Sequence, residues 1–181
     1  IITPAALQTE AERVAQLHRE EGLTVAVIEQ EKIFNEFSSG TPDASAYRRL
    51  MKMFYDRAEG NENVRPRYLL LFGDGSYNNR KSMEKLHSPE CNMLLTYQSK
   101  TSIDERESFV IEDSFGFLEN NSGEEIKVDK VCLGIGRFPI SSIKNARLVV
   151  DKLYRYVHDK DFSSWKNNIC IAADDGDEAI H

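Results

Sequence analysis

Four short apolar runs, separated by amphipathic stretches, constrain the fold of this chain more than any other sequence feature. They lie at residues 24–28, 68–72, 131–135 and 169–172 and are rich in aliphatic, often β-branched, side chains. The runs are nearly continuous rather than alternating, which is typical of parallel strands covered on both faces. We therefore predict a mainly parallel sheet, and Ile1 and Ile2 are expected to belong to a further strand of it.

Three stretches beside these runs have the apolar spacing of helices that cover a sheet. They span residues 3–22, 43–60 and 141–157, with Pro4 and Ser142 as start signals. Their predicted core residues are Leu7, Ala11, Val14 and Leu17, then Tyr47, Leu50, Met51 and Phe54, then Ile143, Ala146, Val150, Leu153 and Val157. Strands and helices alternate, which predicts an α/β fold with a mainly parallel sheet flanked by helices.

The alternation breaks between residues 73 and 130, which are rich in Gly, Asn, Ser and charged residues. We predict a single α/β subdomain over residues 1–181 in which 73–130 is a loop-rich insertion. A short hairpin is expected there, with arms at 114–118 and 126–128. Because the chain begins at Ile1 rather than Met, we expect it to be a piece of a longer protein.

Charge and cysteine content exclude several classes of function. Twenty-three Lys and Arg against 30 Asp and Glu give a net charge of -7, which repels a phosphate backbone, so no nucleic acid is expected as a partner. The apolar runs are far shorter than the roughly 20 residues that cross a bilayer. Three cysteines at irregular spacing, Cys91, Cys132 and Cys170, fit neither a disulfide framework nor a zinc site.

Two acidic loops follow predicted strands, where open α/β sheets bind ligands. Residues 73–75 (Gly-Asp-Gly) follow 68–72, and residues 174–178 (Asp-Asp-Gly-Asp-Glu) follow 169–172. The ligand site of such a sheet lies beyond the carboxyl ends of its strands. Carboxylates there can hold a divalent cation, orient a catalytic histidine or receive a cationic substrate side chain. The same residue types also form ordinary turns, so the pattern leaves these alternatives open.

Without the help of a family resemblance, the sequence shows no complete set of residues for nucleophilic catalysis. Cys132 and Cys170 fall in apolar runs, where a buried thiol is a packing residue. Cys91 follows His87 by four positions, but Pro89 disfavours the helical turn that would bring the two together. No Gly-x-Ser-x-Gly, Walker or Rossmann pattern occurs. The residues therefore predict an α/β domain with an acidic pocket.

A series of segments in a fixed order resembles one protein family. The segments are YLLLFGDGSY at 68–77, GIGRFP at 134–139, residues 146–156 and AADDGD at 172–177, with shorter matches at 96–99, 113–116 and Trp165. Together they resemble the gingipain-type cysteine peptidases and, within that family, the cell-surface sortases of the type IX secretion system in Bacteroidetes. The resemblance extends over essentially the whole chain.

This resemblance implies the first subdomain of a caspase-like catalytic domain, in which two α/β subdomains lie side by side. In the family, the catalytic histidine and the cysteine nucleophile belong to the second subdomain. The chain would then be the N-terminal half of a cysteine endopeptidase or transpeptidase that processes the C-terminal sorting signals of secreted cargo. A half without nucleophile and base is expected to be inactive, because their loss costs on the order of a million-fold in rate.

The resemblance also implies functional roles for individual residues of this sequence. Asp175, followed by Gly176, matches the acid that orients the catalytic histidine. Glu178 lies near the position where arginine-specific members hold a carboxylate for the substrate's basic side chain, although the loop here is shorter. Asp74 matches a calcium ligand, but Cys132 stands where related chains carry an acid, and calcium prefers oxygen ligands. No cofactor is required, and calcium is the one candidate.

The implied partners are the second catalytic subdomain, polypeptide substrates that end in C-terminal sorting domains, and outer-membrane proteins of the secretion machinery. The implied location is secreted, at the outer membrane or cell surface. Two other functions stay open: a non-catalytic docking module of the same fold, and metal-dependent phosphoryl transfer through Asp74, Asp174 and Asp175. We expect Arg137 to pair with the acidic loops rather than contact substrate.

Overall fold

The computed structural model describes residues 1–80, 93–99, 101, 103–104, 108–124, 128–161 and 163–171. The strands are β1 (Ile2–Thr3), β2 (Ile28–Glu29), β3 (Tyr68–Phe72) and β4 (Gly134–Phe138). The α-helices are α1 (Gln8–Glu20), α2 (Gln30–Phe37), α3 (Ser45–Arg57) and α5 (Ile143–His158), and the 3-10 helices are η1 (Ala5–Leu7), η2 (Glu112–Gly116) and η3 (Ser164–Asn167). Within this described part, no helix is both long and apolar enough to span a membrane.

The strands form one parallel sheet in the order β2-β1-β3-β4. Strands β3 and β4 pair along their whole length, from Tyr68 opposite Gly134 to Phe72 opposite Phe138. Parallel neighbours need long crossovers. Helix α1 connects β1 to β2, α2 and α3 connect β2 to β3, and the insertion that contains η2 connects β3 to β4. The predicted mainly parallel sheet flanked by helices is confirmed, and Ile2 belongs to it as expected.

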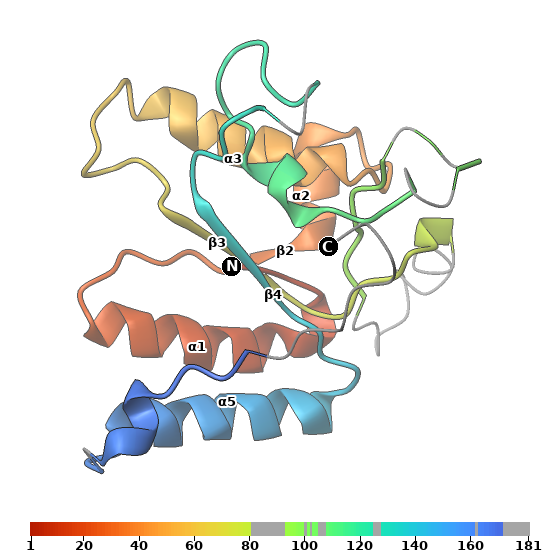
Figure 1. The fold of residues 1–181 in the computed structure, drawn as a ribbon. Coiled ribbons are helices and arrows are strands. Elements are labelled where there is room, and N and C mark those ends of the chain that lie inside the picture. The colour runs from red at the N-terminus through yellow and green to blue at the C-terminus, as the bar shows by residue number, and fades with distance from the viewer. Residues whose placement is uncertain are drawn as a thin grey trace, which may run out of the picture.

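Helices cover both faces of this sheet. Leu69 and Leu71 of β3 pack with residues of α2 and α3, whereas Phe72 packs with residues of α1 and α5. Side chains alternate between the faces along a strand, so a strand covered on both sides is apolar throughout. Figure 1 shows α1 and α5 on one side of the sheet and α2 and α3 on the other.

The three predicted helices are present, although α1 begins at Gln8 after the 3-10 helix η1, and α3 and α5 begin two residues later than predicted. The Ser142 hydroxyl accepts a hydrogen bond from the Asn145 backbone N–H and caps α5. The Asp43 carboxylate accepts one from the Ser45 backbone N–H just before α3. All four predicted core positions of the first helix are buried, but three predicted core positions of the other two helices are exposed: Phe54, Ile143 and Val157.

Two strands lie elsewhere than predicted. The strand expected at 131–135 begins three residues later, because Cys132 donates its backbone N–H to the Gly116 carbonyl and not to a strand. Of the strand expected at 24–28, only Ile28 pairs with β1. Helix α2 follows directly from β2 without a glycine or proline between them, and the sequence pattern missed it.

The strand expected at 169–172 is wrong for its described part. Residues 169–171 form no strand, and Ile169 and Ile171 are 89% and 83% exposed. Cys170 is exposed as well, so its predicted burial is also wrong. Strand β4 is at the edge of the described sheet, and residues 169–171 do not pair with it or with another described strand. Ala172 lies outside the described residues.

The hairpin expected in the insertion is also wrong in its first arm. Residues 114–116 belong to η2, and Gly116 fits there because a Cβ would lie 2.6 Å from Val131 Cγ1. Two of the three residues of the second arm, 126 and 127, lie outside the described residues. The insertion instead contains an antiparallel bridge between Gln98 and Val110.

Candidate functional site

The loop after β3 lies at the carboxyl edge of the sheet. Gly73 donates its backbone N–H to the Phe138 carbonyl at the end of β4, with an N–O distance of 3.1 Å. The Asp74 carbonyl accepts from the Leu94 backbone N–H at 2.8 Å. The segment 93–99, far away in sequence, is thereby brought to the edge where the parallel strands end, which is where such sheets bind ligands.

Arg137 holds this edge together through every N–H of its guanidinium group. Its Nε donates to Glu112 Oε1 at 2.8 Å, and Nη2 donates to Glu112 Oε2 at 3.2 Å and to the Leu95 carbonyl at 3.1 Å. Its Nη1 donates to the carbonyls of Gly73 and Asp74 at 3.3 and 3.1 Å. An arginine has five such donors, so none is left for a substrate. The predicted ion pair with the first acidic loop is wrong, because Arg137 pairs with Glu112 and contacts that loop only through the backbone carbonyls of Gly73 and Asp74. The second acidic loop lies outside the described residues.

Buried side chains fix the segment 93–96 from its other side. The Tyr47 hydroxyl donates to Gln30 Oε1 and accepts from the Leu95 backbone N–H. Gln30 Nε2 donates to the Met93 carbonyl at 2.9 Å. Tyr47 and Gln30 are both buried, and buried polar groups need such partners. Side chains therefore supply here the hydrogen bonds that a neighbouring strand supplies elsewhere.

A third set of contacts joins this segment to the residues after the Gly-Asp-Gly turn. Asn79 Oδ1 accepts from the Thr96 backbone N–H at 3.0 Å, and Asn79 Nδ2 donates to the Thr96 carbonyl at 2.7 Å. The Thr96 hydroxyl donates to the Ser76 carbonyl at 2.8 Å. Gly75 lies against the same groups, since a Cβ there would be 2.9 Å from Thr96 Cγ2 and 3.2 Å from Arg137 Cζ.

Asp74 is half-buried at the centre of this edge. Its Oδ1 accepts from the Gly75 backbone N–H at 2.9 Å. Within the described ranges, no three His, Cys, Asp or Glu side chains gather in a way that could hold a metal ion. These residues by themselves do not fit calcium, which takes six to eight oxygen ligands. A calcium ion at Asp74 stays a prediction.

A hollow of about 490 Å³ lies beside the edge. Residues 95–98 form one wall, residues 41–45 before and at the start of α3 form another, and Asn79 closes one side. Helix α3 runs antiparallel to β3, so its first residues reach the carboxyl edge of the sheet. The hollow therefore adjoins the contacts made by Arg137 and Asn79.

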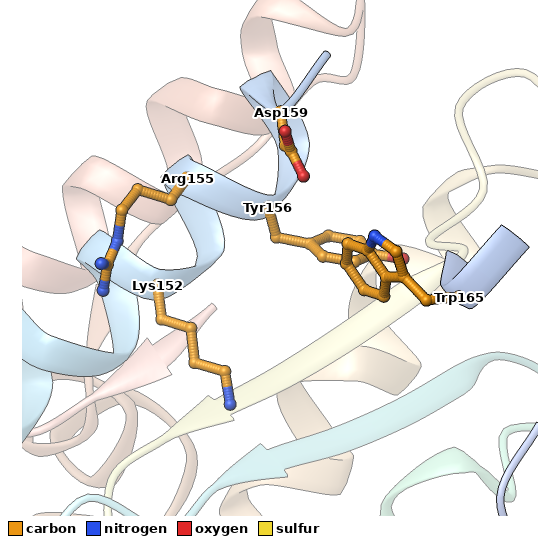
Figure 2. A pocket seen from close by; sticks show the side chains of 5 residues that line it. All are labelled: Lys152, Arg155, Tyr156, Asp159 and Trp165. Carbon is orange, nitrogen blue, oxygen red and sulfur yellow. The ribbon is translucent and has the colours of Figure 1, made fainter. Parts of the chain in front are cut away.

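Another hollow lies at a different place. It measures about 580 Å³ and is lined by Lys152, Arg155, Tyr156, Asp159 and Trp165 at the end of α5. Figure 2 shows the rings of Tyr156 and Trp165 close together, and their centroids are 6.2 Å apart. Helix α5 runs back antiparallel to β4, which puts this end of the helix at the amino edge of the sheet (Figure 1). It is therefore at the opposite edge of the sheet from Asp74, which directly follows β3.

The remaining predicted site residues lie outside the described part of the chain. These are Asp174, Asp175 and Glu178, together with Cys91 and His87. Cys132 is half-buried ahead of β4, with its Sγ 3.8 Å from the Lys130 carbonyl. The structure thus places Asp74 at the carboxyl edge as predicted, and it adds Arg137, Glu112 and the segment 93–99, which the sequence did not bring together.

A parallel sheet covered on both faces, with long loops held at its carboxyl edge, defines an α/β protein of the class that binds its ligands at that edge. The sequence profile of peptidase family C25 matches residues 1–181. The chain therefore belongs to peptidase family C25, and the resemblance to gingipain-type cysteine peptidases is confirmed.

A solved structure supports this assignment. The chain is similar to PorU from Porphyromonas gingivalis, known from a crystal structure of its dimeric latent form, with 40% sequence identity and a TM-score of 0.77. The match covers 95% of this chain and 17% of that chain, so the chain spans about a sixth of the length of that relative. No curated protein matches the chain significantly.

Proposed function

We propose that this chain is the first half of the catalytic domain of a cysteine peptidase or transpeptidase that removes C-terminal sorting signals from secreted polypeptides. The observation that carries the proposal is the match to peptidase family C25 over residues 1–181. The similarity to PorU and the segments that resemble type IX sortases support the more specific function. The protein would act outside the cell, at the outer membrane.

The proposed reaction is acyl transfer through a cysteine thioester. A cysteine thiolate of the second subdomain attacks the carbonyl carbon before the sorting signal, and the peptide bond breaks as the leaving amine takes a proton from the catalytic histidine. Water or an acceptor amine then attacks the thioester, the thiolate leaves, and the histidine takes up the proton of the attacking group. This chain contributes Asp175, which accepts a hydrogen bond from the histidine and stabilises its protonated form.

Further roles belong to the same proposal. Glu178 receives a basic side chain of the substrate, since a carboxylate pairs well with lysine or arginine. Asp74 contributes to a calcium site together with oxygen ligands from outside the described residues. The second catalytic subdomain and outer-membrane proteins of the secretion machinery are the proposed partners, along with the secreted polypeptides themselves.

A cleavage assay with purified cargo tests the proposal. The full-length protein is expected to release the C-terminal sorting domain from a secreted cargo protein, and the 181-residue chain alone is expected to release none, because the nucleophile and base belong to the other half. Cleavage products are measured by gel electrophoresis and mass spectrometry over time. Cleavage by the 181-residue chain, or none by the full-length protein, would contradict the proposal.

A further inference from the structure

We propose that Arg137 is a positioning residue for substrate binding, which holds residues 95–98 in place as one wall of the substrate groove. The inference rests on the proposed function and adds to it the residue that shapes the binding surface. Arg137 does not touch substrate in this account. Its effect passes through the backbone carbonyls that it binds.

The first argument is the number of separate segments that meet at one guanidinium group. Arg137 lies in β4, the Gly73 and Asp74 carbonyls follow β3, the Leu95 carbonyl belongs to the wall, and Glu112 begins η2. Three of these four segments lie in the insertion at 73–130, whose described residues form little regular structure besides η2. One side chain therefore joins three segments of the insertion to β4.

The second argument is the fit between the guanidinium group and its surroundings. The Arg137 side chain is only 11% exposed, and all five of its donors are used. Gly75 packs directly on it, with no room for a side chain. A lysine would keep the positive charge, but it has three donors on a single nitrogen and cannot bridge the same acceptors in a plane.

The third argument is the position of the hollow. Its wall at 95–98 begins at Leu95, whose carbonyl Arg137 binds. The hollow lies at the carboxyl edge, where parallel sheets bind their ligands. An extended polypeptide that lies beside residues 95–98 would lose contacts if that segment moved, even though the nucleophile and the histidine belong to another subdomain.

The test compares Arg137→Lys with a matched control, Arg48→Lys, in the full-length protein. Arg48 also donates to backbone carbonyls, those of Phe117 at 2.8 Å and Ser122 at 2.6 Å, but it holds a loop away from the hollow. The KM and kcat for cleavage of a cargo protein with its C-terminal sorting domain are measured for both variants. The rate at which iodoacetamide alkylates the nucleophilic cysteine is measured alongside, because this reagent needs no substrate groove.

We expect Arg137→Lys to raise KM by about 10- to 100-fold, because a misplacement near 1 Å can cost an enzyme about 100-fold and residues 95–98 act on substrate binding in this proposal. Its kcat and its alkylation rate are expected to stay within about twofold of wild type, and Arg48→Lys is expected to change none of the three. Glu112→Gln is a milder second variant that keeps the shape of the contact and is expected to raise KM in the same direction.

Two results would overturn the inference. The first is an Arg137→Lys enzyme with a KM like that of Arg48→Lys. The second is an equal loss of kcat and alkylation rate, which would mean that the substitution disturbs the whole domain and not the groove. A wild-type protein that neither cleaves cargo nor has an alkylatable catalytic cysteine would instead contradict the proposed function itself, and the inference with it.

Discussion

Replacing Asp175 by asparagine in the full-length protein is expected to lower kcat for cargo cleavage by about four orders of magnitude, the size of the effect when the orienting acid of a catalytic triad is changed in this way. In the proposed mechanism, the carboxylate would hold the histidine in the tautomer that can accept a proton from the thiol. It would also stabilise the positive charge that forms on the ring. An asparagine fills the same space but offers no negative charge and favours the wrong tautomer.

Asp177 provides the matched control, because it belongs to the same acidic loop and no role is assigned to it. Asp177→Asn is expected to keep kcat within about threefold of wild type. Steady-state cleavage of cargo measures both variants. Equal losses in the two variants would mean that the loop contributes only its total charge, and the specific role of Asp175 would then be wrong.

Replacing Phe72 by alanine is expected to lower the free energy of unfolding by about 3–5 kcal/mol, the usual cost of removing a buried aromatic ring. Phe72 is completely buried and packs with Leu7, Val14 and Val150, which belong to η1, α1 and α5. Its ring also contacts that of Phe138 on β4, with centroids 5.9 Å apart. Since domains of this kind are stable by only about 5–15 kcal/mol, the loss is a large part of the total.

The unfolding measurement uses urea and the 181-residue chain. Val64→Ala is the control, since Val64 is an apolar residue with most of its surface exposed, and it is expected to change the free energy of unfolding by less than about 0.5 kcal/mol. A Phe72→Ala loss below about 1 kcal/mol would show that the layer of α1 and α5 does not pack on the sheet as described.

Strand β3 and helix α5 were predictable because their own residues specify them. β3 is covered on both faces and is therefore apolar at every position, so its bounds of Tyr68–Phe72 are those of the sequence run. Helix α5 has a serine cap followed by regular apolar spacing. The local pattern and the tertiary contacts agree at most positions, the exceptions being the exposed side chains of Tyr68 in β3 and of Ile143 and Val157 in α5.

Strand β4 and the segment 169–171 show where local pattern fails. β4 contains Gly134 and Gly136, residues disfavoured in strands, and it forms because its backbone pairs with β3 along five residues. The run at 169–171 has strand-forming residues but pairs with no described strand. Pairing partners decide strands, and a single sequence does not reveal them.

The contacts at the carboxyl edge of the sheet could not be predicted from the sequence, for a different reason. Arg137 could be recognised as a charged residue at the end of a strand, but its partners Glu112 and Leu95 are 25 and 42 positions away in the sequence. Both lie in an insertion with little periodicity. Asp74 was predictable because it follows β3 directly, and the position of such a loop is fixed by the strand before it.

The central claim, that this chain is one half of a cysteine peptidase, is tested most directly by labelling the full-length protein with iodoacetamide while cargo cleavage is followed. Mass spectrometry then identifies each alkylated cysteine. We expect cleavage to be lost in step with the labelling of one cysteine outside residues 1–181, whatever the labelling of Cys91, Cys132 and Cys170. Cleavage that persists when every accessible cysteine is alkylated, or that is lost in step with one of these three, would contradict the claim.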